Sequence, residues 1–308
     1  MRAKKASKRN KTLQIDAGEL AQFKQQHKQI HHPCTPADIE NHILCQETLT
    51  TLAYLPANQY DLIFADPPYR MRKTFQSITF NTLDRDRYAE WLNSWISQLP
   101  RIMKANASIY ICGDWRSSSL IEQIASQYFY IHNRITWERE KGRGAQHNWK
   151  NASEDIWFCS LSREYAFNVD AVKSKRRVLA PYKEAGHAKD WSENESGRYR
   201  LTHPSNLWTD LTVPFWSMTE NTTHPTQKPE KLLARILLAS SQAGDWVLDP
   251  FLGSGTAAVV AKKLGRVFTG IELDPYYASV SLKRLSQTRL GQRIQGYEDG
   301  VFLERNTQ

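Results

Sequence analysis

Cysteine is scarce in this sequence, and the cysteines that are present lie far apart. Among 308 residues there are only four, namely Cys34, Cys45, Cys112 and Cys159. This spacing supports neither a disulfide framework nor a paired-cysteine zinc site, so we expect no metal and a reducing setting. Long apolar runs are also missing, and none approaches the roughly 20 residues that a membrane-spanning helix needs. We therefore expect no membrane partner.

Acidic residues are too few to balance the basic ones. The 41 Lys and Arg residues against 32 Asp and Glu residues give a net charge of +9, which is weak support for a polyanionic partner. Residues 1–30 carry much of this excess, and because no apolar stretch follows them we expect no secretory signal. This segment is either a solvated tail or an arm that grips phosphates, and the composition leaves both interpretations open.

A glycine-containing turn follows a predicted strand in the C-terminal part of the chain. The strand over residues 246–248 leads to Gly253 and Gly255, and the next strand, over residues 267–271, ends at Glu272. The glycines let the backbone bend and approach a ligand, and Glu272 can accept hydrogen bonds from ribose hydroxyls. The pattern predicts an adenosine-type cofactor without separating NAD from S-adenosylmethionine. A turn with a purely structural role is the alternative.

A second turn, Asp66-Pro67-Pro68-Tyr69, ends the predicted strand over residues 60–65. It fits the methylation of an exocyclic amine, which is a poor nucleophile because its lone pair is delocalised into the base ring. The Asp66 carboxylate and the Pro67 carbonyl can accept both amino hydrogens and favour a tetrahedral nitrogen. Tyr69 offers a face on which an extruded base can stack. The alternative is a proline-rich turn with a capping aspartate.

Three motifs, in their order along the chain, resemble the β class of amino-methylating DNA methyltransferases. They are residues 66–69, 224–229 and 249–256, and the resemblance covers about residues 42–286. In most other S-adenosylmethionine-dependent enzymes the glycine loop precedes the catalytic turn, whereas here it follows, as in this circularly permuted class. The resemblance implies a doubly wound, mostly parallel α/β sheet with helices on both faces, one antiparallel strand and an inserted target-recognition region.

The resemblance also implies which residues bind S-adenosylmethionine. Asp249 would meet its amino group, Lys228 would lie near its carboxylate, and Glu272 would take the ribose hydroxyls. Further contacts would come from Phe251, Gly253, Ser254, Gly255 and Thr256. Such enzymes usually carry Gly-Asp upstream of the catalytic turn, where this chain has Gln46 and Glu47. Glu47 would therefore seat the adenine of the cofactor with one extra methylene.

The function that the resemblance implies is site-specific methylation of a flipped adenine at N6 in double-stranded DNA. Asp66 at the head of the turn favours adenine, because cytosine-N4 enzymes of this type more often have serine there. A cytosine-N4 methyltransferase remains the alternative. An NAD-dependent dehydrogenase would leave the Asp66 turn unexplained, and a non-catalytic DNA-binding protein would leave the filled catalytic positions unexplained.

The implied organisation has five parts. They are a basic N-terminal arm (1–41), a catalytic half (42–161), a target-recognition region (162–223), a cofactor-binding half (224–290) and a C-terminal tail (291–308). The basic residues predicted to contact DNA are Arg139, Lys141, Arg143, Lys150, Lys175, Arg176 and Arg177, although a solvated loop would explain the first four equally well. Candidate partners besides DNA are a cognate restriction endonuclease and a second copy of the chain. The predicted location is the bacterial cytoplasm, close to the nucleoid.

Overall fold

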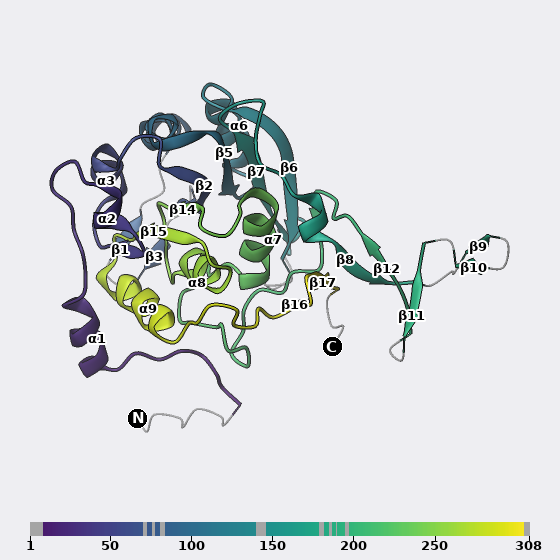
Figure 1. The fold of residues 1–308 in the computed structure, drawn as a ribbon. Coiled ribbons are helices and arrows are strands. Elements are labelled where there is room, and N and C mark those ends of the chain that lie inside the picture. Colours follow the sequence, from purple (N-terminus) through teal and green to yellow (C-terminus); the bar gives the residue numbers. More distant parts are fainter. Residues whose placement is uncertain are drawn as a thin grey trace.

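A mixed eight-stranded sheet forms the centre of the protein (Figure 1). The computed structural model describes residues 9–69, 73–75, 78–80, 84–139, 146–178, 182–184, 187–188, 190–194 and 197–304. The strands in spatial order are β1 (His42–Leu44), β15 (Val267–Ile271), β14 (Trp246–Asp249), β2 (Tyr60–Ala65), β5 (Met103–Gly113), β7 (Ser153–Ser160), β6 (Tyr130–Glu138) and β13 (Leu207–Trp208).

Strand direction agrees with the predicted sheet. In this sheet β7 alone runs antiparallel to its neighbours β5 and β6, and every other pair is parallel. The predicted α/β fold with one antiparallel strand is therefore confirmed. The strand that leads to Asp66 precedes the strand that leads to the glycine loop in the chain, and the two lie side by side.

Helices cover both faces of the sheet, and each face has its own hydrophobic core. On one face lie α7 (Glu230–Ser240), α8 (Thr256–Lys263) and α9 (Pro275–Ser286). On the other lie α3 (Thr48–Tyr54), α4 (Arg85–Ile96), α5 (Leu99–Ile102) and α6 (Ser118–Ala125). Successive side chains of β2 point to opposite faces of the sheet. Leu62 and Phe64 therefore pack in the first core, and Ile63 and Ala65 pack in the second. Two short strands, β3 (Lys73–Phe75) and β4 (Ile78–Phe80), pair after the catalytic turn.

A second sheet begins beside the body, and its strands β8 (Ser174–Arg177), β12 (Gly197–Thr202) and β11 (Ser192–Asn194) project from it (Figure 1). The strand order in this sheet is β11, β12, β8, β17 (Val301–Leu303) and β16 (Tyr297–Glu298). A 3₁₀ helix, η1 (Val169–Val172), precedes it, and β9 (Lys183–Glu184) pairs with β10 (His187–Ala188) near its tip. The described part of the predicted tail belongs to this sheet, because β17 pairs with β8, and its Phe302 is fully buried. Within residues 162–223, β13 instead joins the central sheet beside β6.

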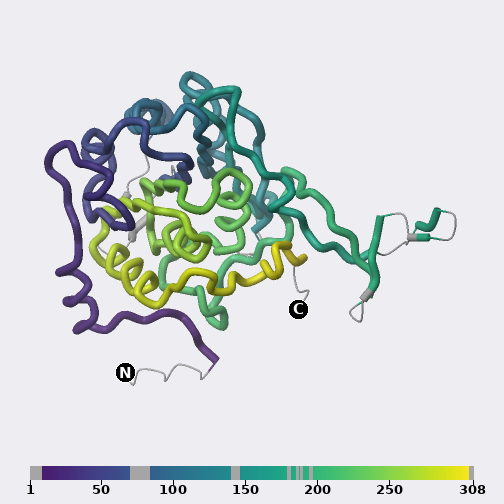
Figure 2. Tube along the Cα trace, viewed as in Figure 1, coloured from purple at the N-terminus to yellow at the C-terminus, as the bar shows by residue number. Residues whose placement is uncertain are grey.

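The described part of the predicted N-terminal arm packs against the body (Figure 2). It contains α1 (Ala17–Lys24), which Asp16 caps, and α2 (Pro36–Ile39). Lys283 of α9 donates hydrogen bonds to both carboxylate oxygens of Glu19, at 2.6 and 2.5 Å. Ile30 and Ile39 are buried, so residues 9–41 do not form a free arm. The predicted N-terminal arm is held to the body by the burial of these apolar side chains and by the ion pair between Glu19 and Lys283.

Candidate active site

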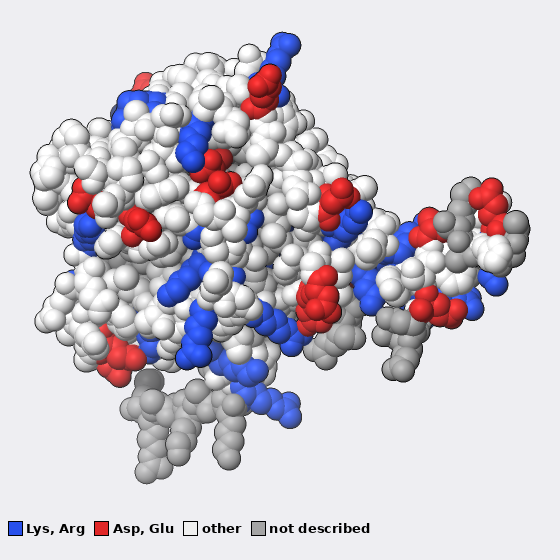
Figure 3. Space-filling model, in the orientation of Figure 1, with Lys and Arg blue, Asp and Glu red and all other residues white. Residues whose placement is uncertain are grey.

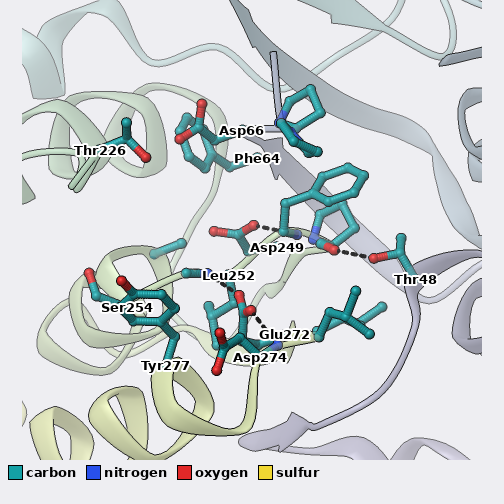
Figure 4. A pocket seen from close by; sticks show the side chains of 18 of the residues that line it. Thr48, Phe64, Asp66, Thr226, Asp249, Leu252, Ser254, Glu272, Asp274 and Tyr277 are labelled. Carbon is teal, nitrogen blue, oxygen red and sulfur yellow. Dashed lines mark hydrogen bonds between the residues drawn. The ribbon is translucent and has the colours of Figure 1, made fainter. Parts of the chain in front are cut away.

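The catalytic turn and the glycine loop meet in one pocket at the carboxyl edge of the sheet. Strands β2, β14 and β15 are parallel neighbours, so the residues that follow them come together. Asp66, Asp249 and Glu272, one from each strand end, all line this pocket (Figure 4). The structure thereby brings together most of the predicted site residues, and the pocket lining includes Glu47, Asp66, Pro67, Pro68, Tyr69, Lys228, Asp249, Phe251, Gly253, Ser254, Thr256 and Glu272.

The cofactor end of the pocket contains two carboxyl groups, of which Asp249 is buried and Glu272 half-buried. Glu272 accepts backbone N–H hydrogen bonds from Gly253 at 2.7 Å and from Asp274 at 2.8 Å, and burial raises the pKa of its carboxyl to about 7. Asp249 accepts one from Phe251 at 3.0 Å, and burial raises the pKa of Asp249 well above its ordinary value. Among the described residues, no cation lies within ion-pair distance of either carboxyl group. Both groups are placed to accept hydrogens from a ligand.

An aromatic wall stands beside these carboxyl groups. The ring centroid of Phe251 lies 5.1 Å from that of Trp95 and 5.8 Å from that of Trp91. The two tryptophans come from α4, and both line the pocket. Neither tryptophan is among the predicted site residues, because apolar spacing along a helix does not distinguish a core position from a pocket wall.

The glycines of the loop have different structural roles. Gly253 has a φ of +56°, and a Cβ atom there would lie 3.1 Å from Nε2 of His224. Gly255 has a φ of +81° and initiates α8, and its Cβ would lie 2.8 Å from Cβ of Ser281 on α9. Gly253 therefore keeps the pocket open beside His224. Gly255 is required for close packing against α9, a role that differs from the predicted ligand contact.

The carboxylate of Glu47 caps the helix that follows it, α3. It accepts backbone N–H hydrogen bonds from Leu49 at 2.9 Å and from Thr50 at 2.7 Å. Thr48 next to it donates to the carbonyl of Pro250 at 2.7 Å, which ties α3 to the glycine loop. The side chain of Glu47 still lines the pocket, and its role toward the adenine of the cofactor stays a prediction.

At the catalytic end, Asp66 is held by two donors. The Tyr69 hydroxyl donates to Oδ1 at 2.9 Å, and the Lys228 ammonium donates to Oδ2 at 2.5 Å. Tyr88 donates from its hydroxyl to the carbonyl of Pro68 at 3.1 Å and so fixes the turn. Burial alone would lower the pKa of Lys228, but the carboxylates of Asp66 and Glu154 outweigh it and raise that pKa. The structure thus pairs Lys228 with Asp66, and its predicted contact with the cofactor carboxylate remains a prediction.

Glu154 on β7 is a further charged neighbour of Lys228, and it is not among the site residues predicted from the sequence. Its Oε2 atom lies 3.3 Å from the Lys228 ammonium, and its Oε1 atom pairs with Arg139. The sequence offers one signal for Glu154. Alternation along the strand puts this acidic residue on the same face as the apolar residues Ile156 and Phe158, where a charge is unexpected. The guanidinium of Arg139 lies over the ring of Trp137 and bonds to this buried acid. The predicted DNA contact assumes that Arg139 extends from a loop, whereas this side chain is held against Glu154 and Trp137.

The other basic residues predicted to contact DNA lie in varied settings. Lys150 is exposed, the Lys175 ammonium lies 4.2 Å from the centroid of the Tyr199 ring, and Arg176 lies 3.8 Å from Glu304. Arg177 is exposed, and Lys141 and Arg143 lie outside the described residues. On the face in Figure 3, basic and acidic side chains are interspersed, on the projecting sheet as well as on the body.

The described residues show neither a metal site nor a membrane span. No group of three or more potential metal ligands occurs among them. None of the helices described combines the length and apolar character needed to cross a bilayer. The pocket does fit S-adenosylmethionine, since buried carboxyl acceptors suit its amino and hydroxyl groups and the aromatic wall suits its apolar parts. A mostly parallel α/β sheet with such a pocket at its carboxyl edge is typical of enzymes that bind an adenosine-containing cofactor.

Comparisons with known proteins identify the family. The profile of the family described as DNA methylase, of the N6/N4 type, matches residues 60–283. DNA adenine methyltransferase YhdJ of Escherichia coli (strain K12) is 35% identical over 82% of this chain and 86% of its own length. Type II methyltransferase M.HpaI of Haemophilus parainfluenzae is 31% identical over 80% and 74%, respectively. The chain therefore belongs to the N6/N4 DNA methylase family, and it is an S-adenosylmethionine-dependent DNA methyltransferase.

Solved structures support the same fold. The cytosine-N4-specific PvuII DNA methyltransferase aligns with a TM-score of 0.57 at 17% identity, over 79% of this chain and 85% of that one. A putative DNA modification methylase from Thermus thermophilus, complexed with S-adenosyl-L-methionine, aligns with a TM-score of 0.56 at 19% identity, over 87% and 99%. The family match, rather than this likeness in fold, argues against the dehydrogenase interpretation.

Proposed function

We propose that this enzyme methylates the exocyclic N6 amine of a flipped adenine at a specific site in double-stranded DNA. The observation that carries the proposal is the position of Asp66, which lines the same pocket as Asp249 and Glu272 (Figure 4). The 35% identity to a protein named DNA adenine methyltransferase supports adenine as the target. So does the aspartate at the head of the turn, where related cytosine enzymes more often have serine.

The residues at the catalytic end would activate the amine. S-adenosylmethionine supplies a methyl group on a positively charged sulfur. Asp66 and the Pro67 carbonyl would accept the two amino hydrogens, which directs the nitrogen lone pair toward that methyl group. Tyr88 keeps the Pro68 carbonyl in place, and this contact fixes the backbone next to Pro67. Tyr69 lines the same pocket, where its ring would support the target base.

The residues at the cofactor end would hold S-adenosylmethionine. Glu272 would accept the ribose hydroxyls, and Asp249 would accept the amino group of the methionine part. Trp91, Trp95 and Phe251 would form an apolar wall that excludes water from this end. The raised pKa of Glu272 fits such a role, because a buried carboxyl without a cation gains most from new hydrogen-bond donors.

The projecting sheet is the proposed target-recognition element. It contains Lys175, Arg176 and Arg177 and extends away from the body (Figure 1). Exposed Lys150, at the carboxyl edge of the central sheet, is a further proposed phosphate contact. A cognate restriction endonuclease and a second copy of the chain are proposed partners, since two relatives are named type II methyltransferases. A place beside the nucleoid would follow from DNA as the substrate.

The identity of the methylated base tests the proposal. The purified protein is incubated with S-adenosylmethionine and unmethylated DNA, the DNA is digested to nucleosides, and methylated species are identified by mass spectrometry. N6-methyladenine is the expected product, and N4-methylcytosine would overturn the choice of base while leaving the enzyme class intact. DNA that is already methylated at N6 serves as the control, since it should accept no further methyl groups.

A further inference from the structure

Four charged side chains from four separate segments, two of them buried, form a cluster at the catalytic end. Lys228 lies between two carboxylates, with its ammonium 2.5 Å from Oδ2 of Asp66 and 3.3 Å from Oε2 of Glu154. Arg139 takes the other oxygen of Glu154. The side chains of Lys228 and Glu154 are only 5% and 2% exposed. Two cations and two anions therefore neutralise one another, and Lys228 and Glu154 do so almost out of contact with water.

This arrangement has a consequence for a base that enters the pocket. Oδ1 of Asp66 already accepts the Tyr69 hydroxyl, and Oδ2 accepts the Lys228 ammonium. A target amine that bonds to Asp66 must share this carboxylate with both donors, and on the Oδ2 side the Lys228 ammonium has to shift to admit it. A buried ammonium cannot leave a carboxylate cheaply unless a second acceptor is at hand. Glu154 is that acceptor, because it already lies 3.3 Å from the same nitrogen.

We propose that Glu154 is a positioning residue for methyl transfer, which holds the Lys228 ammonium beside Asp66 and takes it over when the target amine bonds to Asp66. The proposal rests on the function proposed above for Asp66. Arg139 fixes the carboxylate of Glu154 from the opposite side, and its guanidinium is itself held over the Trp137 ring, 5.7 Å from the centroid. Trp137 is the cross-strand partner of Glu154, so β6 and β7 together set the position of this acid.

The test is Glu154→Gln, which keeps the size of the side chain and removes its charge. We expect kcat at saturating S-adenosylmethionine and DNA to fall about 100-fold, because the amine can no longer displace Lys228. Dissociation constants for cofactor and DNA should stay within about twofold, since Glu154 is not among the residues that line the pocket. Glu154→Asp keeps the charge and should restore a large part of kcat. The matched control is Asp155→Asn on the same strand, which pairs with exposed Arg134 and should leave kcat unchanged.

A double-mutant cycle separates this role from simple structural support. Because Glu154 acts through Lys228, adding Glu154→Gln to Lys228→Met should reduce the residual single-turnover rate by less than about twofold. Multiplicative effects of the two changes would overturn the proposal. So would a wild-type kcat in Glu154→Gln while Asp66→Ala is inactive, which leaves the role of Asp66 intact. If Asp66→Ala itself remained active, the proposed function would fail instead. Circular dichroism of each variant shows whether it has folded.

Discussion

The two ends of the pocket handle buried negative charge in different ways. At the cofactor end, Asp249 and Glu272 accept only backbone N–H groups, and burial raises the pKa of both. At the catalytic end, Asp66 has the Lys228 ammonium at 2.5 Å. A buried carboxyl without a cation is neutralised by taking up a proton, whereas one with a cation is neutralised by its partner. Binding of S-adenosylmethionine at the cofactor end should therefore release protons from these carboxyl groups. Binding of the target base at the catalytic end should instead move the Lys228 ammonium.

The same contrast suggests that the two ends of the pocket depend little on each other. Glu154 lies 3.3 Å from the Lys228 ammonium, so under our proposal it should neutralise Lys228 when Asp66 is occupied or removed, and such changes should have little effect at the cofactor end. The glycine loop is in turn supported from behind, where Arg284 donates to the Ser254 carbonyl at 2.9 Å. Each end has its own supporting residues, and the predictions below test whether the two ends are independent.

Loss of Asp66 should have the largest effect. Asp66→Ala removes a principal acceptor for the target amine, and we expect the single-turnover rate of methyl transfer to fall by about 10³-fold or more. S-adenosylmethionine affinity, measured by calorimetry, should change less than about threefold because Glu154 still pairs with Lys228. Asp66→Asn keeps one acceptor oxygen and should retain more activity than Asp66→Ala. A large loss of cofactor affinity in either variant would show that the two ends are not independent.

The pH dependence of cofactor binding should be the next largest effect. The pKa of Glu272 rises to about 7 from an ordinary value of 4.5, so the folded protein without ligand holds this proton more tightly than the unfolded chain. The stability that this group contributes is full below pH 4.5 and is lost as the pH rises to about 7. Hydroxyl donors require the carboxylate form, so S-adenosylmethionine affinity should rise about tenfold between pH 6 and pH 8.

Glu272→Gln tests this dependence directly. We expect the variant to bind S-adenosylmethionine about tenfold more weakly at pH 8 and to show a much flatter pH dependence. Calorimetry in buffers of different ionisation enthalpy measures both the affinity and the protons released. Exposed Glu90→Gln on α4 is the matched control and should behave as the wild type. An unchanged pH slope in Glu272→Gln would assign the proton coupling to another group, such as Asp249.

Support of the glycine loop from behind should have a smaller effect. Buried Arg284 donates to the Ser254 carbonyl at 2.9 Å and to the Thr256 hydroxyl at 3.0 Å, and its pair with Glu230 is 3.1 Å. Arg284→Met should lower the free energy of unfolding by about 2 kcal/mol, measured by urea denaturation. The loss stays moderate because Lys263 still neutralises Glu230 at 2.6 Å.

The same variant distinguishes loop support from catalysis. Cofactor affinity should fall several-fold in Arg284→Met, while kcat at saturating S-adenosylmethionine stays close to that of the wild type. Exposed Arg289→Met is the control for loss of a positive charge in this region and should change neither property. A reduced kcat at saturation would mean that the glycine loop also positions the catalytic turn.

Much of this site could be predicted from local sequence signals. The strand before Asp66 ends at two prolines and the strand before Gly253 ends at a glycine turn, and both strand ends are observed where they are predicted. Glu154 could not be found in this way, because it reaches Lys228 only through the pairing of β7 with β5 and β6. Strand β13 has two residues and no periodicity to detect. Local patterns indicate where strands end, whereas partners that are distant in sequence depend on strand order.

The smallest effect that we predict belongs to the Tyr88 hydroxyl, which donates to the Pro68 carbonyl at 3.1 Å. Tyr88→Phe removes this contact and keeps the ring in its buried position on α4. A hydrogen bond of about 1 kcal/mol corresponds to roughly a fivefold lower single-turnover rate, with cofactor affinity unchanged. Tyr128→Phe is the control, since its hydroxyl donates to Asn93 on the surface. If Tyr88→Phe also weakened cofactor binding, the rigidity of the catalytic turn would have to support both ends of the pocket, because the same helix supplies Trp91 and Trp95 to the aromatic wall.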